Sequence, residues 1–243
     1  MSKLTEYQIE KGFWYGPSEL KLIQTVEEYD GSKQLRIAIP NDKELRKWIS
    51  FLPTLNKVEY LMVNSNVNQK LFDAICSIKS LVVLYITMTT AKRIDDLYKL
   101  NKLKYLCIGN GTRIESIEVI GLLTNLKILE LENIKKITNF EVISKLTSLE
   151  GLGICGSMWT AQKIETLQPI SFLHKLKYLK IVNTITVDKN FDPLLQLREL
   201  ETFNSSWNYP KKEFEKLKEL PLLKKSNVSS CLVNCKIYLP KHG

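Results

Sequence analysis

Residues 126–149 read LKILELENIKKITNFEVISKLTSL, and this stretch decides the fold. It opens on the pattern Leu-x-x-Leu-x-Leu, which starts at Leu126 and points alternate side chains of a short strand toward one side. Apolar residues then recur at every third position, at Phe140, Ile143 and Leu146. Spacing by threes suits a 3-10 helix or a short α-helical turn that faces the same core as the strand. At Leu149 the strand pattern begins again, so the stretch is one unit of a repeat.

The same unit recurs along most of the chain. Strand starts lie at Val58, Leu81, Leu103, Leu126, Leu149, Leu176 and Leu200, with a degenerate start at Leu223. Successive starts are 22 to 24 residues apart, except for the 27 residues that separate Leu149 from Leu176. The fourth residue of each unit is Leu61, Leu84, Leu106, Leu129, Leu152, Leu179 and Phe203. The sixth is Val63, Ile86, Ile108, Leu131, Ile154, Ile181 and Ser205. Because no unit can bury its apolar side alone, neighbouring units are expected to stack, with their strands in one parallel sheet.

The period and the joints Leu-Thr-Asn-Leu (123–126) and Leu-Thr-Ser-Leu (146–149) resemble the leucine-rich repeat family, over roughly residues 34–222. Within that family the chain is similar to the short-repeat bacterial class typified by internalins. The resemblance implies an α/β solenoid with a parallel concave sheet and short helical or 3-10 convex segments. It also implies recognition of a partner without a reaction. One departure concerns the ninth position, where the family usually has Asn or Cys. Here that position holds Asn66, Thr89, Gly111, Ile134, Ser157, Thr184 and Asn208.

The ends of the chain are expected to cap the repeats. Residues 1–33 are predicted to form an N-terminal cap containing a β-hairpin, with strands around 20–26 and 35–39 joined at Asp30-Gly31. Phe13, Trp14 and Tyr15 are expected to plug that end of the core. Residues 34–222 form the repeats, and residues 223–243 are predicted to form a C-terminal cap.

Composition limits the function classes. The chain has 243 residues, of which 44% are hydrophobic, and no apolar run reaches the roughly 18 residues that a membrane span needs. The N-terminus lacks an apolar signal region, so we expect a monomeric cytoplasmic protein that does not enter a membrane. Its five cysteines are scattered and odd in number, which favours reduced thiols over a disulfide framework. The net charge of +9 permits acidic partners without requiring them.

No residue set predicts a catalytic, cofactor or metal site. Gly151, Gly153 and Gly156 match a dinucleotide-binding pattern, but they alternate with core residues of a strand and so do not form a phosphate-binding turn. Cys231, Cys235 and His242 are too loosely spaced for a zinc site, and no fourth ligand is evident. Lysines recur at the second position of several units, but glutamates interrupt the series: Lys104, Lys127, Glu150, Lys177 and Glu201. A nucleic-acid groove would need a more continuous basic stripe with aromatic residues, so nucleic acid is disfavoured.

The third, fifth and seventh positions of each unit define the concave face of the predicted sheet. Tyrosine and methionine gather there, where water is the expected neighbour, and such side chains often mark protein-binding surfaces. The predicted partner-binding residues on this face are Tyr60, Met62, Tyr85, Tyr105, Glu130, Glu132, Gly151, Gly153, Tyr178 and Lys180. The alternative is that these side chains pack against one another along the sheet.

The long repeat adds a second predicted feature, a loop over residues 155–166 that overhangs one edge of the concave face. Trp159 in this loop and Trp207, farther along the chain, complete the predicted partner-binding set. Gly151 and Gly153 are expected to leave a hollow beside the loop. Alternatively, Trp159 folds back and fills it.

The sequence therefore predicts a non-catalytic module that binds another protein, as an intracellular scaffold, inhibitor or immunity-type protein. A basic nucleic-acid-binding array and a secreted bacterial effector are the alternatives.

Overall fold

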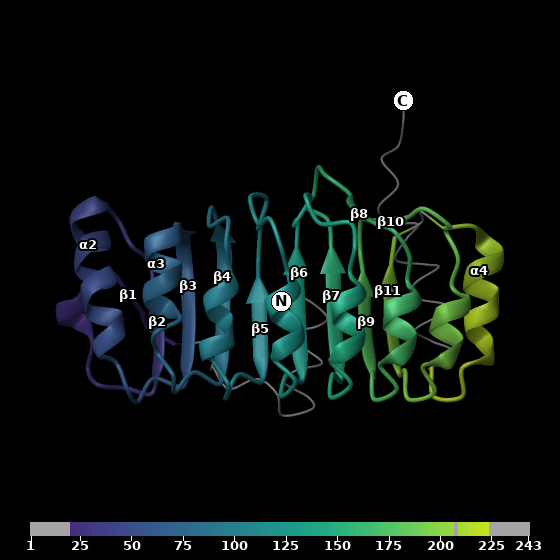
Figure 1. The fold of residues 1–243 in the computed structure, drawn as a ribbon, viewed down its shortest axis with the longest axis horizontal. Coiled ribbons are helices and arrows are strands. Elements are labelled where there is room, and N and C mark those ends of the chain that lie inside the picture. The colour runs from purple at the N-terminus through teal and green to yellow at the C-terminus, as the bar shows by residue number, and fades with distance from the viewer. Residues whose placement is uncertain (1–19, 207–208, 224–243) are drawn as a thin grey trace.

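The structure is a computed structural model that describes residues 20–206 and 209–223. Its main element is a nine-stranded sheet with the order β1-β2-β3-β4-β5-β6-β7-β9-β11. All neighbouring strands pair in parallel. The strands are β1 (Leu22–Ile23), β2 (Gln34–Ile37), β3 (Tyr60–Val67), β4 (Val83–Thr89), β5 (Tyr105–Ile108), β6 (Ile128–Glu132), β7 (Gly151–Cys155), β9 (Tyr178–Ile181) and β11 (Thr202–Ser205). They lie side by side along the long axis of the molecule in chain order (Figure 1). The predicted parallel solenoid is confirmed.

Each return segment that follows a strand contains a short helix. Within the described residues, the α-helices are α2 (Asp42–Phe51), α3 (Gln69–Ile75) and α4 (Lys211–Lys216). The 3-10 helices are η1 (Val26–Glu28), η2 (Leu52–Thr54), η3 (Asp95–Lys99), η4 (Glu118–Leu122), η5 (Glu141–Lys145), η6 (Gln168–Phe172), η7 (Asp192–Gln196) and η8 (Leu217–Glu219). Helices α2 and α3 begin at asparagine caps, because the side chains of Asn41 and Asn68 accept hydrogen bonds from the backbone N–H groups three residues on.

The core lies between the sheet and the helices as one continuous cluster. The fourth residues of the repeats pair in register, for example Leu84 with Leu106 and Leu129 with Leu152, and these leucines are fully buried. The sixth residues are buried beside them, including Ser205 in the last repeat. Each repeat thus supplies one apolar layer that only its neighbours can cover, as expected for a solenoid.

Asparagines stabilise several of the turns after the strands, one residue earlier than the family pattern predicts. Asn110, Asn133 and Asn183 each occupy the eighth position of their repeat and have φ angles of 46°, 52° and 51°. Asparagine tolerates this left-handed conformation better than most residues. The side chain of Asn133 donates a hydrogen bond of 2.7 Å to Asn110, which links successive turns. In these three repeats an asparagine at the eighth position thus forms part of the turn, while the ninth position holds Gly111, Ile134 or Thr184.

The predicted N-terminal β-hairpin is wrong. Strand β1 pairs with β2 in parallel, with Leu22 opposite Arg36. The 3-10 helix η1 intervenes, and Glu28 and Thr25 form a capping box at its start. The chain therefore crosses over between β1 and β2 as it does between repeats. Gly31 does adopt the predicted positive φ, at 83°, but within this crossover. The proposed plug of Phe13 to Tyr15 and most of the proposed C-terminal cap lie outside the described residues.

A second, two-stranded sheet was not predicted. Strand β8 (Gln162–Ile164) lies within the long repeat and pairs in parallel with β10 (Thr184–Thr186) of the next repeat. The pair lies near the carboxyl ends of β7 and β9 (Figure 1). It therefore fixes the predicted loop against the following repeat.

Candidate partner-binding surface

The concave face carries a buried aromatic layer, which we call the concave tyrosine cluster. Its members are Tyr60, Val83, Tyr105, Cys107, Ile128 and Tyr178. All except Cys107 occupy the third position of their repeats, and this row continues in register from β3 to β6. The rings of Tyr85 and Tyr105 stack with centroids 6.4 Å apart. Side chains on parallel strands are close neighbours, so the row packs along the sheet.

The expectation that these tyrosines contact water is wrong. Tyr60 is 2% exposed, and Tyr105 and Tyr178 are each 1% exposed. Part of this burial comes from the cluster itself and part from Leu20 and Val82, which pack against it. Burial also raises the pKa of Tyr60 to about 12. A role of the tyrosines in binding a partner stays a prediction, but exposure no longer supports it. Met62 and Tyr85 are half-buried.

A charged row crosses the concave face beside the tyrosine cluster. Glu130 on β6, Gly153 on β7 and Lys180 on β9 are in register. Lys180 Nζ lies 3.1 Å from Glu130 Oε1, although the two residues are separated by an intervening strand and by 50 positions in the sequence. Gly153 carries no side chain, which leaves room for the two long side chains to meet across β7. The predicted hollow at Gly151 and Gly153 is therefore wrong, because both glycines are buried.

Glu132 leaves a negative charge next to this ion pair. It lies at the carboxyl end of β6 and is exposed, and it makes no ion pair within the part of the chain that the structure describes. Although the residue reaches water, partial burial of its carboxyl group and the neighbouring Glu130 raise the pKa of Glu132. Burial alone would lower the pKa of Lys180, but Cys155 and Glu130 raise it overall. Lys180 therefore pairs with Glu130, while Glu132 remains an acidic group that faces outward.

The edge loop, defined here as residues 156–161, is held by its own hydrogen bonds. The Ser157 N–H donates to the Thr160 carbonyl over 2.9 Å, and the Thr160 N–H donates to Ser157 Oγ over 3.0 Å. The Asn183 side chain donates to the Ser157 carbonyl over 2.7 Å. At Gly156, an added Cβ would lie 2.4 Å from the carbonyl oxygens of Asn183 and Thr160. The chain therefore needs glycine at this close approach.

This loop exposes two large apolar side chains at its tip. Met158 is 84% exposed and Trp159 is 89% exposed. Val187, which directly follows β10, is also 84% exposed. The alternative in which Trp159 folds back into a hollow is wrong. An ordered loop that holds a tryptophan in water presents a large contact area at small entropic cost.

Some predicted features cannot be placed. Trp207, Cys231, Cys235 and His242 lie outside the described residues. Gly151 and Gly153 lie within strand β7, as predicted from the alternation of core residues.

In residues 20–206 and 209–223, no helix is both long and apolar enough to cross a membrane.

The cysteines of the described repeats are poorly suited to nucleophilic chemistry. Cys76, Cys107 and Cys155 are unpaired and buried. Burial raises the pKa of all three thiols, and it raises the pKa of Cys155 to about 12. A nucleophilic cysteine needs a lowered pKa and an accessible sulfur atom. These thiols therefore act as small core residues.

A sequence-family model of leucine-rich repeat regions matches residues 34–237. This match covers most of the chain and agrees with the register of the sheet. The chain belongs to the leucine-rich repeat family. A search of curated proteins found no match.

Solved structures share this leucine-rich repeat fold. Internalin C2 from Listeria monocytogenes is 20% identical, with a TM-score of 0.55 over 72% of this chain and 71% of the internalin. A leucine-rich repeat protein of Leptospira interrogans is 22% identical, with a TM-score of 0.54 over 84% of this chain and 48% of that protein. The plant peptide hormone receptor RGFR1, solved in complex with RGF2, is 16% identical, with a TM-score of 0.52 over 86% of this chain and 34% of the receptor. The chain thus spans about half of the Leptospira protein and a third of the receptor. At these identities the likeness concerns the fold, which is the internalin-like fold predicted from the repeat length.

Proposed function

We propose that this leucine-rich repeat protein is a non-catalytic module that binds a partner protein through the edge loop and the adjoining part of the concave face. In this proposal it acts inside the cell, as a monomeric scaffold, inhibitor or immunity-type protein. The observation that carries the proposal is the exposure of Met158 and Trp159 on a loop fixed by hydrogen bonds. Exposed apolar side chains that adjoin one another can form a protein-binding surface.

The chemistry around the loop suggests what the partner provides. Tryptophan is enriched among the residues that dominate binding energy, where it fills an apolar pocket on the other protein. Glu132 lies one strand away, because it pairs in register with Cys155 at the end of β7. We therefore expect a partner with an apolar pocket for Trp159 and a cationic side chain near Glu132. The family resemblance supports recognition of a protein, since RGFR1 was solved with RGF2 bound, but it does not identify the partner.

The test uses affinity capture from host cells with the wild-type chain and two variants. Trp159→Ala removes the exposed loop ring, while Leu122→Ala removes a side chain that is 68% exposed on the convex helix η4 and serves as a matched control. A binding hot spot contributes about 2 kcal/mol or more, so Trp159→Ala should weaken binding of the purified partner about 30-fold. The melting temperature of the Trp159→Ala variant should equal that of the wild type, because the Trp159 ring is exposed. Equal binding by Trp159→Ala and the wild type would overturn the proposed surface.

Cell fractionation tests the proposed location, with a cytoplasmic enzyme as the marker. Recovery of the protein outside the cell would favour the alternative of a secreted effector.

A further inference from the structure

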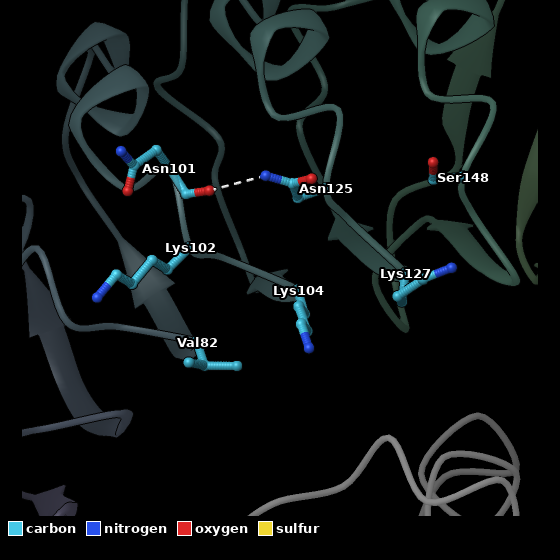
Figure 2. A pocket seen from close by; sticks show the side chains of 7 residues that line it. All are labelled: Val82, Asn101, Lys102, Lys104, Asn125, Lys127 and Ser148. Carbon is cyan, nitrogen blue, oxygen red and sulfur yellow. Dashed lines mark hydrogen bonds between the residues drawn. The ribbon is translucent and has the colours of Figure 1, made fainter.

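A cavity lies beside the amino-terminal ends of β4, β5 and β6. The edge loop lies at the other end of the strands, after the carboxyl end of β7. Its volume is about 630 Å³, and its lining includes the side chains of Lys102, Lys104 and Lys127. Val82 forms an apolar side, and Asn101, Asn125 and Ser148 complete the lining. Figure 2 shows these residues around the space, on three successive repeats. We call this feature the lysine cavity.

The lysine cavity has an excess of positive charge. Lys127 forms an ion pair of 3.1 Å with Glu150, and the same glutamate pairs with Lys177 at 3.1 Å. Lys102 and Lys104 are exposed and form no ion pair with any residue in the ranges that the structure describes. One carboxylate is therefore shared between two lysines, while two further ammonium groups remain available for a ligand.

The remaining lining can bind a polypeptide backbone. The side chain of Asn125 donates a hydrogen bond of 3.0 Å to the Asn101 carbonyl, and this bond leaves its amide oxygen available as an acceptor. Ser148 adds a hydroxyl group, which can donate and accept. A peptide carries both N–H donors and carbonyl acceptors, so this mixed lining suits it better than a lining of cations alone would.

The directions of the lysines argue against a single small anion. In Figure 2 the side chains of Lys102, Lys104 and Lys127 spread outward from different repeats and do not point at one centre. Lys102 and Lys104 precede β5 and Lys127 precedes β6, so the lysines are distributed over the starts of two neighbouring strands, which lie about 4.8 Å apart. An extended peptide, which advances about 3.3 Å per residue, can place acidic side chains against more than one of these lysines. A single-stranded nucleic acid would be expected to stack on aromatic side chains, and none is among the described residues that line the cavity.

We infer that the lysine cavity is a second recognition site, which binds an acidic segment of a polypeptide, with Asp or Glu side chains placed against Lys102 and Lys104. This inference rests on the proposed function, since it assumes a protein ligand. The lysine cavity lies at the amino-terminal ends of the strands, whereas Trp159 lies beyond the carboxyl end of β7. A partner that spans both ends would bind through an apolar contact at one and charge pairing at the other.

The test measures binding of a fluorescein-labelled hexaglutamate peptide by anisotropy at low salt. The variant Lys102→Gln/Lys104→Gln should bind at least tenfold more weakly than the wild type. The control Lys43→Gln/Lys70→Gln loses the same two charges from exposed positions on the helices α2 and α3. It should bind as the wild type does. The peptide affinity should also fall as salt is added, because the contact is ionic. The variants replace exposed side chains, so unchanged melting temperatures will show that both fold.

Three outcomes would overturn the inference. The first is no binding of hexaglutamate by the wild type, and the second is equal weakening in both double variants, which would indicate attraction to net charge alone. The third is tighter binding of a single-stranded oligonucleotide with the same dependence on Lys102 and Lys104, which would assign the cavity to nucleic acid. The hexaglutamate test does not involve Trp159. Its failure is therefore distinguishable from failure of the proposed edge-loop surface.

Discussion

The ion pair between Lys180 and Glu130 provides the sharpest test of the concave-face geometry. The change is Lys180→Met, which keeps the chain length and removes the charge. The atoms Nζ and Oε1 are 3.1 Å apart, and the side chains of Lys180 and Glu130 are only 20% and 10% exposed. Loss of the Lys180 ammonium group leaves the Glu130 carboxylate, which stays largely buried, without a cation partner in the described part of the chain.

The exposed fractions set the expected magnitude. Breaking a fully buried pair costs about 3–5 kcal/mol, whereas surface pairs contribute about 0.2–1 kcal/mol. Because the Lys180 end reaches water, we expect a loss of about 2 kcal/mol in the free energy of unfolding. At about 2–4 °C per kcal/mol for a chain of this size, the melting temperature should fall by roughly 4–8 °C. Glu130→Met should cost less, because a lysine can extend its ammonium group into solvent while a buried carboxylate cannot.

The assay is urea and thermal unfolding of both single variants and of Glu130→Met/Lys180→Met. The double variant should regain most of the loss, because it leaves no unpaired charge beside β7. Lys163→Met, at an exposed position of β8, is the control and should change stability by less than about 0.5 kcal/mol. Additive single losses in the double variant would refute the claim that these side chains meet above Gly153.

Three further predictions concern other parts of the fold. Gly156→Ala should destabilise the protein by about 2 kcal/mol and make the edge loop susceptible to limited proteolysis, because the new Cβ would lie 2.4 Å from two carbonyl oxygens; an unaltered digestion pattern would contradict this. Leu129→Ala should cost about 2–5 kcal/mol in urea unfolding, since its side chain is fully buried in the central layer; a loss below 1 kcal/mol, the scale of a surface site, would argue against the layer. Glu132→Gln should raise the melting temperature at pH 7, because a carboxyl group whose pKa is raised in the folded state weakens the fold when it is ionised. The gain should shrink as the pH falls below the unfolded pKa of about 4.3. A gain that persists at pH 3 would rule out this cause.

The sequence predicted the solenoid because its core pattern is local. Leu106 and Leu129 hold the same place in consecutive repeats, and the period alone sets them side by side. The return segments were predictable for the same reason, since spacing by threes indicates one helical face. The edge loop was predictable as an insertion, because the repeat from Leu149 is longer than its neighbours.

The burial of the concave face was not predictable in this way. A tyrosine such as Tyr105 at an outward strand position gives the same pattern whether water or another apolar side chain lies above it. The pairing of Lys180 with Glu130 was hidden because it depends on a glycine between them and joins residues from repeats that are not adjacent. The parallel pairing of β1 was missed because Asp30-Gly31 favours a tight turn locally, whereas η1 redirects the chain before that turn is reached.

The β8–β10 pair has a consequence for how this protein could diversify. Strands β7 and β9 already pair through Gly151 and Tyr178 before the loop begins, and β8 joins β10 after it. Residues 157–161 are thus anchored on both sides by hydrogen-bonded strands, and, provided Gly156 is kept, changes in their length or composition need not disturb the main sheet. Such a segment can vary while the strands on either side of it keep their pairing. Exchanging it between repeat proteins should redirect recognition while the host fold stays intact.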